Sequence, residues 1–214
     1  MNLSALDQAR RDAENPAAAT METVRSAADD LAAAFVDDPL FDWFMRRGFG
    51  REAARRRFFR VILKEAALPD GVVERPASGG AAAVWIPSEN LGSQPVHREL
   101  RALPMLLGAT GFGRFNRLLQ LRTAMDAHHK SDVPHDYLWF LGVRPDLQGA
   151  GIGSRLLASK TARLDQQGRP GFLETATPRN VPLYTHHGFE TVSEYRPAPD
   201  GPLIWAMWRE PRKP

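Results

Sequence analysis

A strand, a glycine-rich turn and a helix follow one another in the C-terminal half of the chain, and this succession limits the possible folds most. Residues 137–143 form a continuous apolar run, which predicts a buried strand. Residues 149–167 are amphipathic and end at Gly168, which predicts a helix. With the segments that follow, the order is strand, helix, strand, helix, strand, strand. This order is typical of an α/β protein.

Three alternate glycines, Gly149, Gly151 and Gly153, open the predicted helix. Glycine adopts positive φ without strain and lets the backbone approach a ligand closely. The amides of a helix's first turn lack partners within the helix, so with the helix dipole they form an anion site, to which Gln148 adds a side-chain donor. The segment is not a Walker loop, and its glycine spacing departs from the dinucleotide fingerprint. It predicts a phosphate-binding turn of another kind, with a tight turn that binds nothing as the alternative.

The remaining segments predict a single domain. Periodicity and turn residues predict helices at 26–35, 51–67, 96–107, 112–128 and 181–187, and strands at 72–74, 81–86, 171–175, 189–195 and 203–208. Residues 1–19 are Ala-rich and polar, and Pro16 interrupts them, so we expect a flexible tail there, with a frayed helix as the alternative. Residues 20–214 contain no internal repeat and no low-complexity linker, which favours one domain.

Composition excludes several classes of protein. The chain is 43% hydrophobic and 25% charged, as globular proteins are, and it has no cysteine, so disulfides and thiolate sites are impossible. A net charge of +3 is small for a nucleic-acid-binding protein, and we interpret the arginines between residues 51 and 60 as a solvated helix face. No segment is long and apolar enough to cross a membrane, and the two His-His pairs lack metal-site spacing. We expect a cytoplasmic monomer or homodimer with no metal and no nucleic-acid or membrane partner.

The glycine turn also carries a family resemblance. Gln148-Gly149-Ala150-Gly151-Ile152-Gly153 resembles the Q/R-x-x-G-x-G/A signature of GNAT acetyltransferases, and residues 142–145 resemble the end of that family's fourth strand. Asn180 and residues 184–189 resemble its N-x-x-x-Y-x-x-x-G-F element. Residues 172–180 resemble the puromycin N-acetyltransferase branch in particular.

This resemblance implies a GNAT fold, with a central mixed, mostly antiparallel twisted sheet that splays at the acetyl-CoA site and has helices on both faces. It implies acetyl-CoA as cosubstrate, with its diphosphate on the glycine turn and its pantetheine arm along the fourth strand. The residues expected to bind it are Leu141, Gly142, Val143, Gln148, Gly149, Ala150, Gly151, Ile152, Gly153, Ser154 and Asn180.

Acetyl transfer to an amine needs an acid for the leaving thiolate and a neutral attacking amine. By family likeness, Tyr184 is the candidate general acid, with a packing tyrosine as the alternative. Glu174, on the strand that should flank the splay, is an equal candidate for general base, substrate-orienting group or strand anchor, and His135 and Asp136 are weaker candidates. Because no G-x-S-x-G nucleophile motif is present, direct transfer is favoured over an acyl-enzyme.

The acceptor is expected to be a small-molecule amine, with antibiotics and other natural products among the candidates. Asp37 and Asp38 precede a proline where an acceptor-side loop should lie, and they are candidates either for binding a cationic amine or for ordinary turn chemistry. Trp43, Phe44 and Trp85 are candidates for an aromatic pocket wall. The alternatives are acetylation of protein N-termini or lysines, and a non-catalytic acetyl-CoA-binding module.

Overall fold

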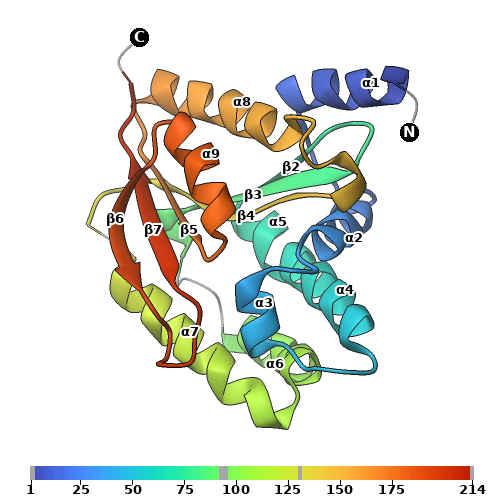
Figure 1. Ribbon diagram of the computed structural model, residues 1–214, viewed down its shortest axis with the longest axis vertical. Coiled ribbons are helices and arrows are strands. Elements are labelled where there is room, and N and C mark those ends of the chain that lie inside the picture. Colours follow the sequence, from blue (N-terminus) through green and yellow to red (C-terminus); the bar gives the residue numbers. More distant parts are fainter. Residues whose placement is uncertain (1–2, 92–95, 130–131, 213–214) are drawn as a thin grey trace.

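The computed structural model describes residues 3–91, 96–129 and 132–212, and its centre is a seven-stranded sheet (Figure 1). The strand order is β1-β2-β3-β4-β5-β7-β6, and every neighbouring pair is antiparallel except β4 and β5. The strands are β1 (Ala17–Ala18), β2 (Val72–Arg75), β3 (Ala81–Pro87), β4 (Asp136–Val143), β5 (Gly171–Thr175), β6 (Glu190–Tyr195) and β7 (Ile204–Arg209). This mixed, mostly antiparallel sheet confirms the predicted fold class.

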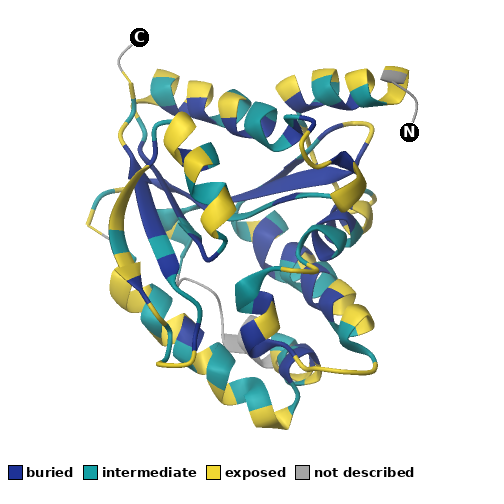
Figure 2. Ribbon diagram, viewed as in Figure 1, coloured by how far each residue is buried: buried dark blue, intermediate teal, exposed yellow. Residues whose placement is uncertain are grey.

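Helices cover both faces of the sheet, and their outer surfaces are exposed, whereas the central strands are largely buried and the edge strand β6 is mostly exposed (Figure 2). One face packs against α1 (Leu3–Glu14), α8 (Ile152–Gln167) and α9 (Val181–His186). The other face packs against α2 (Val24–Ala34), α3 (Pro39–Phe44), α4 (Arg51–Ile62), α6 (Val96–Thr110) and α7 (Phe115–His128), with α5 (Leu68–Asp70) closing the α4 segment. The alternation of β3 explains the division, because Val84 belongs to the second face and Trp85 to the first.

The sheet opens between β4 and β5. Their parallel pairing covers only 136–138 against 171–173, whereas β4 continues to Val143. Beyond Leu138, therefore, β4 pairs with β3 on one side and presents an unpaired backbone edge on the other. A register shift between Val84 and Trp85 accompanies the divergence, as β-bulges commonly do where a strand bends. This is the splay that the family resemblance implies.

The N-terminal residues were expected to form a flexible tail or a frayed helix, and the structure places residues 3–14 in a helix that packs against α8. Ala9 and Ala13 are buried in this contact. The Arg10 guanidinium donates to the carbonyl of Ala150, at 3.0 Å, so α1 touches the glycine turn itself. The correction has a simple cause, since small alanines on one helix face allow close packing that composition alone does not reveal.

Candidate active site

The glycine turn joins β4 to α8 and leaves a row of amides free. Gly149 and Gly151 have φ of 76° and 77°, and Gly151 is the residue preceding the first turn of α8. The backbone amides from Gly149 to Ser154 have no hydrogen-bond acceptor within the described part of the chain. A Cβ built at Gly149 would meet nothing within 4 Å, so the turn faces open space. Free amides, an open approach and the positive end of a helix dipole fit a diphosphate.

The unpaired edge of β4 continues this surface. Because the Arg144 amide donates to Gly80 on the β3 side, the alternation of an extended strand directs the amides of Val143 and Leu141 toward the open side. Gln148, expected to donate to a ligand, donates instead to the Val143 carbonyl at 3.0 Å. Gln148 thus ties the turn to the end of the strand.

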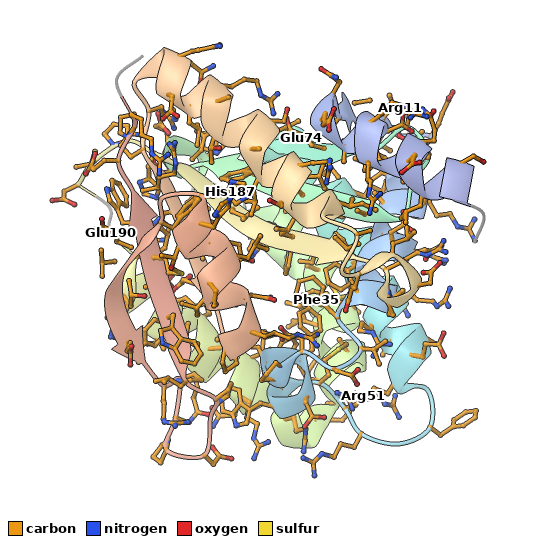
Figure 3. All side chains as sticks on the ribbon, turned by 45° about the horizontal axis from the view of Figure 1, so that its top comes forward. Arg11, Phe35, Arg51, Glu74, His187 and Glu190 are labelled. Carbon is orange, nitrogen blue, oxygen red and sulfur yellow. The ribbon has the colours of Figure 1, made fainter. Side chains whose placement is uncertain are left out.

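Gly142 has a packing reason to be glycine. A Cβ at this position would lie 2.8 Å from the Cβ of Ala34 and 3.2 Å from the ring of Phe35. Helix α2 therefore rests directly on β4 at this point, and the contact places the C-terminal end of α2 beside the splay. Figure 3 shows Phe35 in the middle of the molecule, below the turn.

A cleft of about 130 Å³ lies where the turn, the β4 edge, α9 and the segment before α3 meet. It brings together several of the predicted site residues from distant parts of the sequence. These are Asp38, Leu141, Gly142, Val143, Gln148, Gly153, Asn180 and Tyr184. Other lining residues were not predicted as binding residues, namely Ala34, Phe35, Thr177, Arg179 and Leu183. Thr177 and Arg179 lie within the segment that carried the family resemblance, which was the available signal.

Tyr184 lies on α9 with its side chain almost fully buried. Its hydroxyl has no hydrogen-bond partner in the described chain, and it lines the cleft. Burial, and secondarily the nearby carboxylate of Asp38, raises the pKa of Tyr184 above its usual value. The phenol therefore keeps its proton at neutral pH, which is the state that a general acid requires.

Asn180 precedes the first turn of α9, where helix capping was the alternative to ligand binding. Its side chain makes no capping bond among the described residues, and it lines the cleft.

Ser154 contributes its backbone amide to the free row of the glycine turn, while its hydroxyl lies 2.8 Å from Nε2 of His187. The side chain of Ile152 is buried in the core. Ile152 and Ala150 can therefore contribute to an anion site only through their backbone.

Asp38 is the N-cap of α3. One carboxylate oxygen accepts from the amides of Leu40 and Phe41, at 3.0 and 3.1 Å, and the other accepts from Thr177 at 3.3 Å. Burial raises the pKa of Asp38 despite these hydrogen bonds. Asp38 therefore has the turn-forming role that the sequence offered as one alternative. Its carboxylate also joins the two walls of the cleft.

Glu174 does not line this cleft. Its side chain points to the α7 face of the sheet, where its oxygens accept from the hydroxyls of Tyr137, at 3.0 Å, and Tyr195. The Tyr195 ring is stacked on His128, with centroids 3.9 Å apart. Burial raises the pKa of Glu174 to about 7, and the two hydroxyls and His128 only partly oppose the shift. This carboxyl can take up or release a proton near neutral pH.

The predicted aromatic wall is not part of the cleft lining. Trp43 and Phe44 are buried, Phe44 in a ring cluster with Phe41 and Phe58. Trp85 is buried on the opposite face of the sheet, where the ammonium of Lys160 lies 5.4 Å from its ring centroid. The reason is packing, because a short helix and an alternating strand turn these large side chains toward the two cores.

His135 and Asp136, the weaker candidates for the base, lie at the start of β4, away from the cleft. The Nε2 atoms of His135 and His129 are 3.0 Å apart, and Asp136 pairs with Lys160 and Arg169. In the described ranges, no group of three or more His, Asp or Glu side chains is placed to hold a metal ion. No helix in those ranges combines the length and apolarity needed to cross a bilayer.

The fold and cleft define a class of protein, and solved structures share it. The chain resembles the crystal structure of histone acetyltransferase HPA2 and related acetyltransferase from Corynebacterium glutamicum, with TM-score 0.68, 24% identity, and coverage of 93% of this chain and 97% of the other. It resembles arylalkylamine N-acetyltransferase 2 from Aedes aegypti, with TM-score 0.59, 13% identity, and coverage of 92% and 98%. It also resembles Drosophila melanogaster polyamine N-acetyltransferase, with TM-score 0.56, 20% identity, and coverage of 88% and 95%. These similarities establish a shared fold, the GNAT fold.

A family model makes the assignment more specific. Residues 111–191 match the model described as acetyltransferase (GNAT) domain. The matched range contains the β4 edge, the glycine turn, Glu174 and Tyr184. Over these residues, therefore, the chain is similar to a GNAT acetyltransferase domain.

Proposed function

We propose that this protein is an acetyl-CoA-dependent N-acetyltransferase that transfers the acetyl group directly to a small-molecule amine. The observation that carries the proposal is a row of unpartnered amides, Gly149 to Ser154, in one continuous surface with the β4 edge and Tyr184. Acetyl-CoA supplies the thioester whose acyl group is transferred. The amides would bind its diphosphate, and the outward amides of Leu141 and Val143 would bind the pantetheine arm.

Two groups would promote the chemistry. The Val143 amide points to the open edge, where it would stabilise negative charge on a carbonyl oxygen. Tyr184, protonated and without another partner in the described chain, would donate a proton to the departing thiolate. Direct transfer agrees with the absence of cysteine from the sequence and with the absence of a serine elbow.

The pKa of about 7 makes Glu174 a candidate for the proton acceptor. Both of its oxygens accept from tyrosine hydroxyls, so a proton would reach it through Tyr137 or Tyr195 rather than directly. Its other possible role is to anchor β5 and β6 through the same two bonds. The pH dependence described in the Discussion distinguishes these roles.

Two observations support an amine as the acetyl acceptor: the acidic residues of the cleft, and the solved structures that share the fold. Asp37 and Asp38 line the cleft, which favours a cationic amine. Two of the structural neighbours are named for small amines, arylalkylamines and polyamines, and such amines are therefore proposed for this chain. Puromycin belongs in the same panel because of the resemblance of residues 172–180.

The experiment measures CoA thiol release from acetyl-CoA in the presence of arylalkylamines, polyamines, aminonucleosides and N-terminal peptides. Calorimetry with CoA alone tests the binding surface separately. Binding together with amine-dependent thiol release supports the proposal. Binding without release from any amine indicates a non-catalytic module, and the absence of heat with millimolar CoA refutes the assignment of the glycine turn.

A further inference from the structure

Two loops of this chain share one sequence. Residues 48–51 and residues 111–114 both read Gly-Phe-Gly-Arg. The first lies between α3 and α4 and the second between α6 and α7. The structure places the loops side by side, since the Arg46 amide donates to the Ala109 carbonyl at 2.8 Å. A tetrapeptide repeated at two distant positions thus forms one local surface, named here the double tip.

The phenyl rings of the double tip are exposed to an unusual degree. Phe49 is 99% exposed and Phe112 is 91% exposed, whereas the next most exposed large hydrophobic residue in the described chain, Met21, is 61% exposed. A Cβ added at Gly48, Gly50 or Gly113 would meet nothing within 4 Å. Neither ring packs on its own loop or on the core. An exposed phenyl group gains nothing from solvent, so these two rings indicate a surface that is covered in another state.

The residues next to the two rings include several arginines. Arg46 and Arg47 are exposed directly before Gly48, and Arg51, labelled in Figure 3, follows Gly50. The Arg51 guanidinium is largely buried and lies 3.0 Å from Asp42, which is 3.9 Å from Arg47. The exposed guanidinium groups of Arg46 and Arg47 therefore give this surface a positive potential.

Arg114 turns its guanidinium inward and joins the two loops. Its guanidinium donates to the carbonyls of Asp42, Trp43 and Met45 at 2.9–3.1 Å. It thereby caps the C-terminal end of α3 and fixes the second tip to the first. Burial, followed by the neighbouring charges of Arg47 and Arg117, lowers the pKa of Arg114 below its usual value.

We propose that the double tip binds the surface of an anionic lipid bilayer, with both phenyl rings inserted among the acyl chains and the arginines against the headgroup phosphates. Aromatic rings and cations at one edge suit an interface that is apolar just beneath a negative surface. The tips are two separate protrusions on glycine-flanked loops, and a fluid bilayer accommodates such protrusions without a matching shape. A folded protein partner would need a complementary surface.

This inference does not depend on the acetyltransferase proposal. The sequence analysis expected no membrane partner because no segment is suited to span a bilayer, and a peripheral contact requires none. The arginines interpreted there as a solvated helix face include Arg51. The structure adds that Arg51 opens α4 directly beside an exposed phenyl ring.

The absence of cysteine from the sequence makes a site-specific test simple. Phe49→Cys and Phe112→Cys are each labelled with an environment-sensitive nitrobenzoxadiazole dye. Val192→Cys is the matched control, because Val192 is 54% exposed on β6, away from the α3–α4 loop (Figure 1). Vesicles contain phosphatidylcholine alone or phosphatidylcholine with about one-third phosphatidylglycerol.

Blue-shifted, brighter emission at both tips with anionic vesicles, and none at position 192, supports the proposal. No change at the tips, or an equal change at position 192, overturns it. Co-sedimentation with the unlabelled protein is the second measurement. Phe49→Ser with Phe112→Ser should weaken vesicle binding about tenfold or more, and Arg46→Gln with Arg47→Gln should weaken it and reduce its salt dependence.

Analytical ultracentrifugation identifies the competing explanation. A wild-type dimer that dissociates in the double serine variant, together with no vesicle binding, would assign the tips to self-association and reject the bilayer. A circular dichroism melt verifies that each variant is folded. Because neither ring contributes to the core, melting temperatures close to that of the wild type are expected.

Discussion

The two walls of the cleft are built in different ways. The cofactor wall is local, because residues 141–154 supply the strand edge, the turn and the free amides in one stretch of chain. The acceptor wall is assembled from distant residues. Asp38, at the start of α3, meets Thr177, which follows β5, at 3.3 Å, and Tyr184 joins them from α9.

This difference has a chemical consequence. The proposed cofactor wall offers backbone groups, so most side-chain changes there should be tolerated unless they fill the turn. The acceptor wall acts through side chains held by one or two bonds each, so single substitutions should change it selectively. The four predictions below test this contrast, from the largest expected effect to the smallest.

The largest effect is expected at Tyr184, a side chain that serves the chemistry itself. Tyr184→Phe keeps the ring and removes the proton donor, so turnover should fall about 10²- to 10⁴-fold while CoA affinity changes little. Steady-state kinetics and calorimetry with CoA measure the two quantities. Wild-type turnover in Tyr184→Phe would eliminate the acid role.

The second effect tests the backbone wall. Gly149→Asp places a side chain and a negative charge in the open space before the turn, where the diphosphate would bind, so CoA affinity should fall about 100-fold. Gly50→Asp is matched, because Gly50 has φ of 81° and Gly149 has φ of 76°, and a Cβ at either position would meet nothing within 4 Å. Both substitutions strain the backbone, and the first alone should weaken CoA binding in calorimetry. Equal losses in the two variants would show that the effect is folding and not phosphate contact.

The third effect is a pH dependence at Glu174, whose pKa of about 7 lies above its ordinary 4.5. The folded protein binds this proton more tightly than the unfolded chain, so the stabilisation is complete below pH 4.5 and is lost as pH rises toward 7, by roughly 3 kcal/mol in total. If the ionised form accepts the amine's proton, kcat/KM should rise across the same range. Activity and stability should then change in opposite directions.

Glu174→Gln should remove both trends and lower kcat/KM about tenfold at neutral pH. Urea unfolding and kinetics, each measured across this pH range, provide the comparison. A variant that loses the stability trend but keeps the rise in activity would leave Glu174 with an anchoring role only.

The smallest effect separates two functions of Asp38. Asp38→Asn keeps an N-cap acceptor for α3, whereas Asp38→Ala removes it and should lower the free energy of unfolding by about 1 kcal/mol. If the charge also attracts a cationic amine, both variants should raise the acceptor KM several-fold. Chemical denaturation measures the first property and acceptor titration the second. An unchanged KM in Asp38→Asn would restrict the residue to capping.

The sequence analysis was accurate where the interaction is local. The buried strand at 137–143, the helix after the glycines and the short helix carrying Tyr184 all agree with the structure, because each depends on periodicity and turn residues within a few positions. It was less accurate for α1, where packing of Ala9 and Ala13 on a distant helix stabilises a segment that reads as a tail. The two tryptophans Trp43 and Trp85 were expected at the pocket wall but are buried in the two cores. Which core a helix or strand faces depends on its distant neighbours, and the local sequence does not show it.

The sequence by itself determined the mixed α/β pattern and the glycine turn that we propose binds phosphate, because glycine conformations and unpaired helix amides are properties of adjacent residues. Only the tertiary structure decided that Asp38 and Tyr184 share a cleft, that Glu174 is enclosed by two tyrosines, and that two Gly-Phe-Gly-Arg loops lie side by side. These arrangements depend on contacts between residues far apart in the chain. Burial, which sets the pKa values and the exposure of the tips, exists only after those contacts have formed.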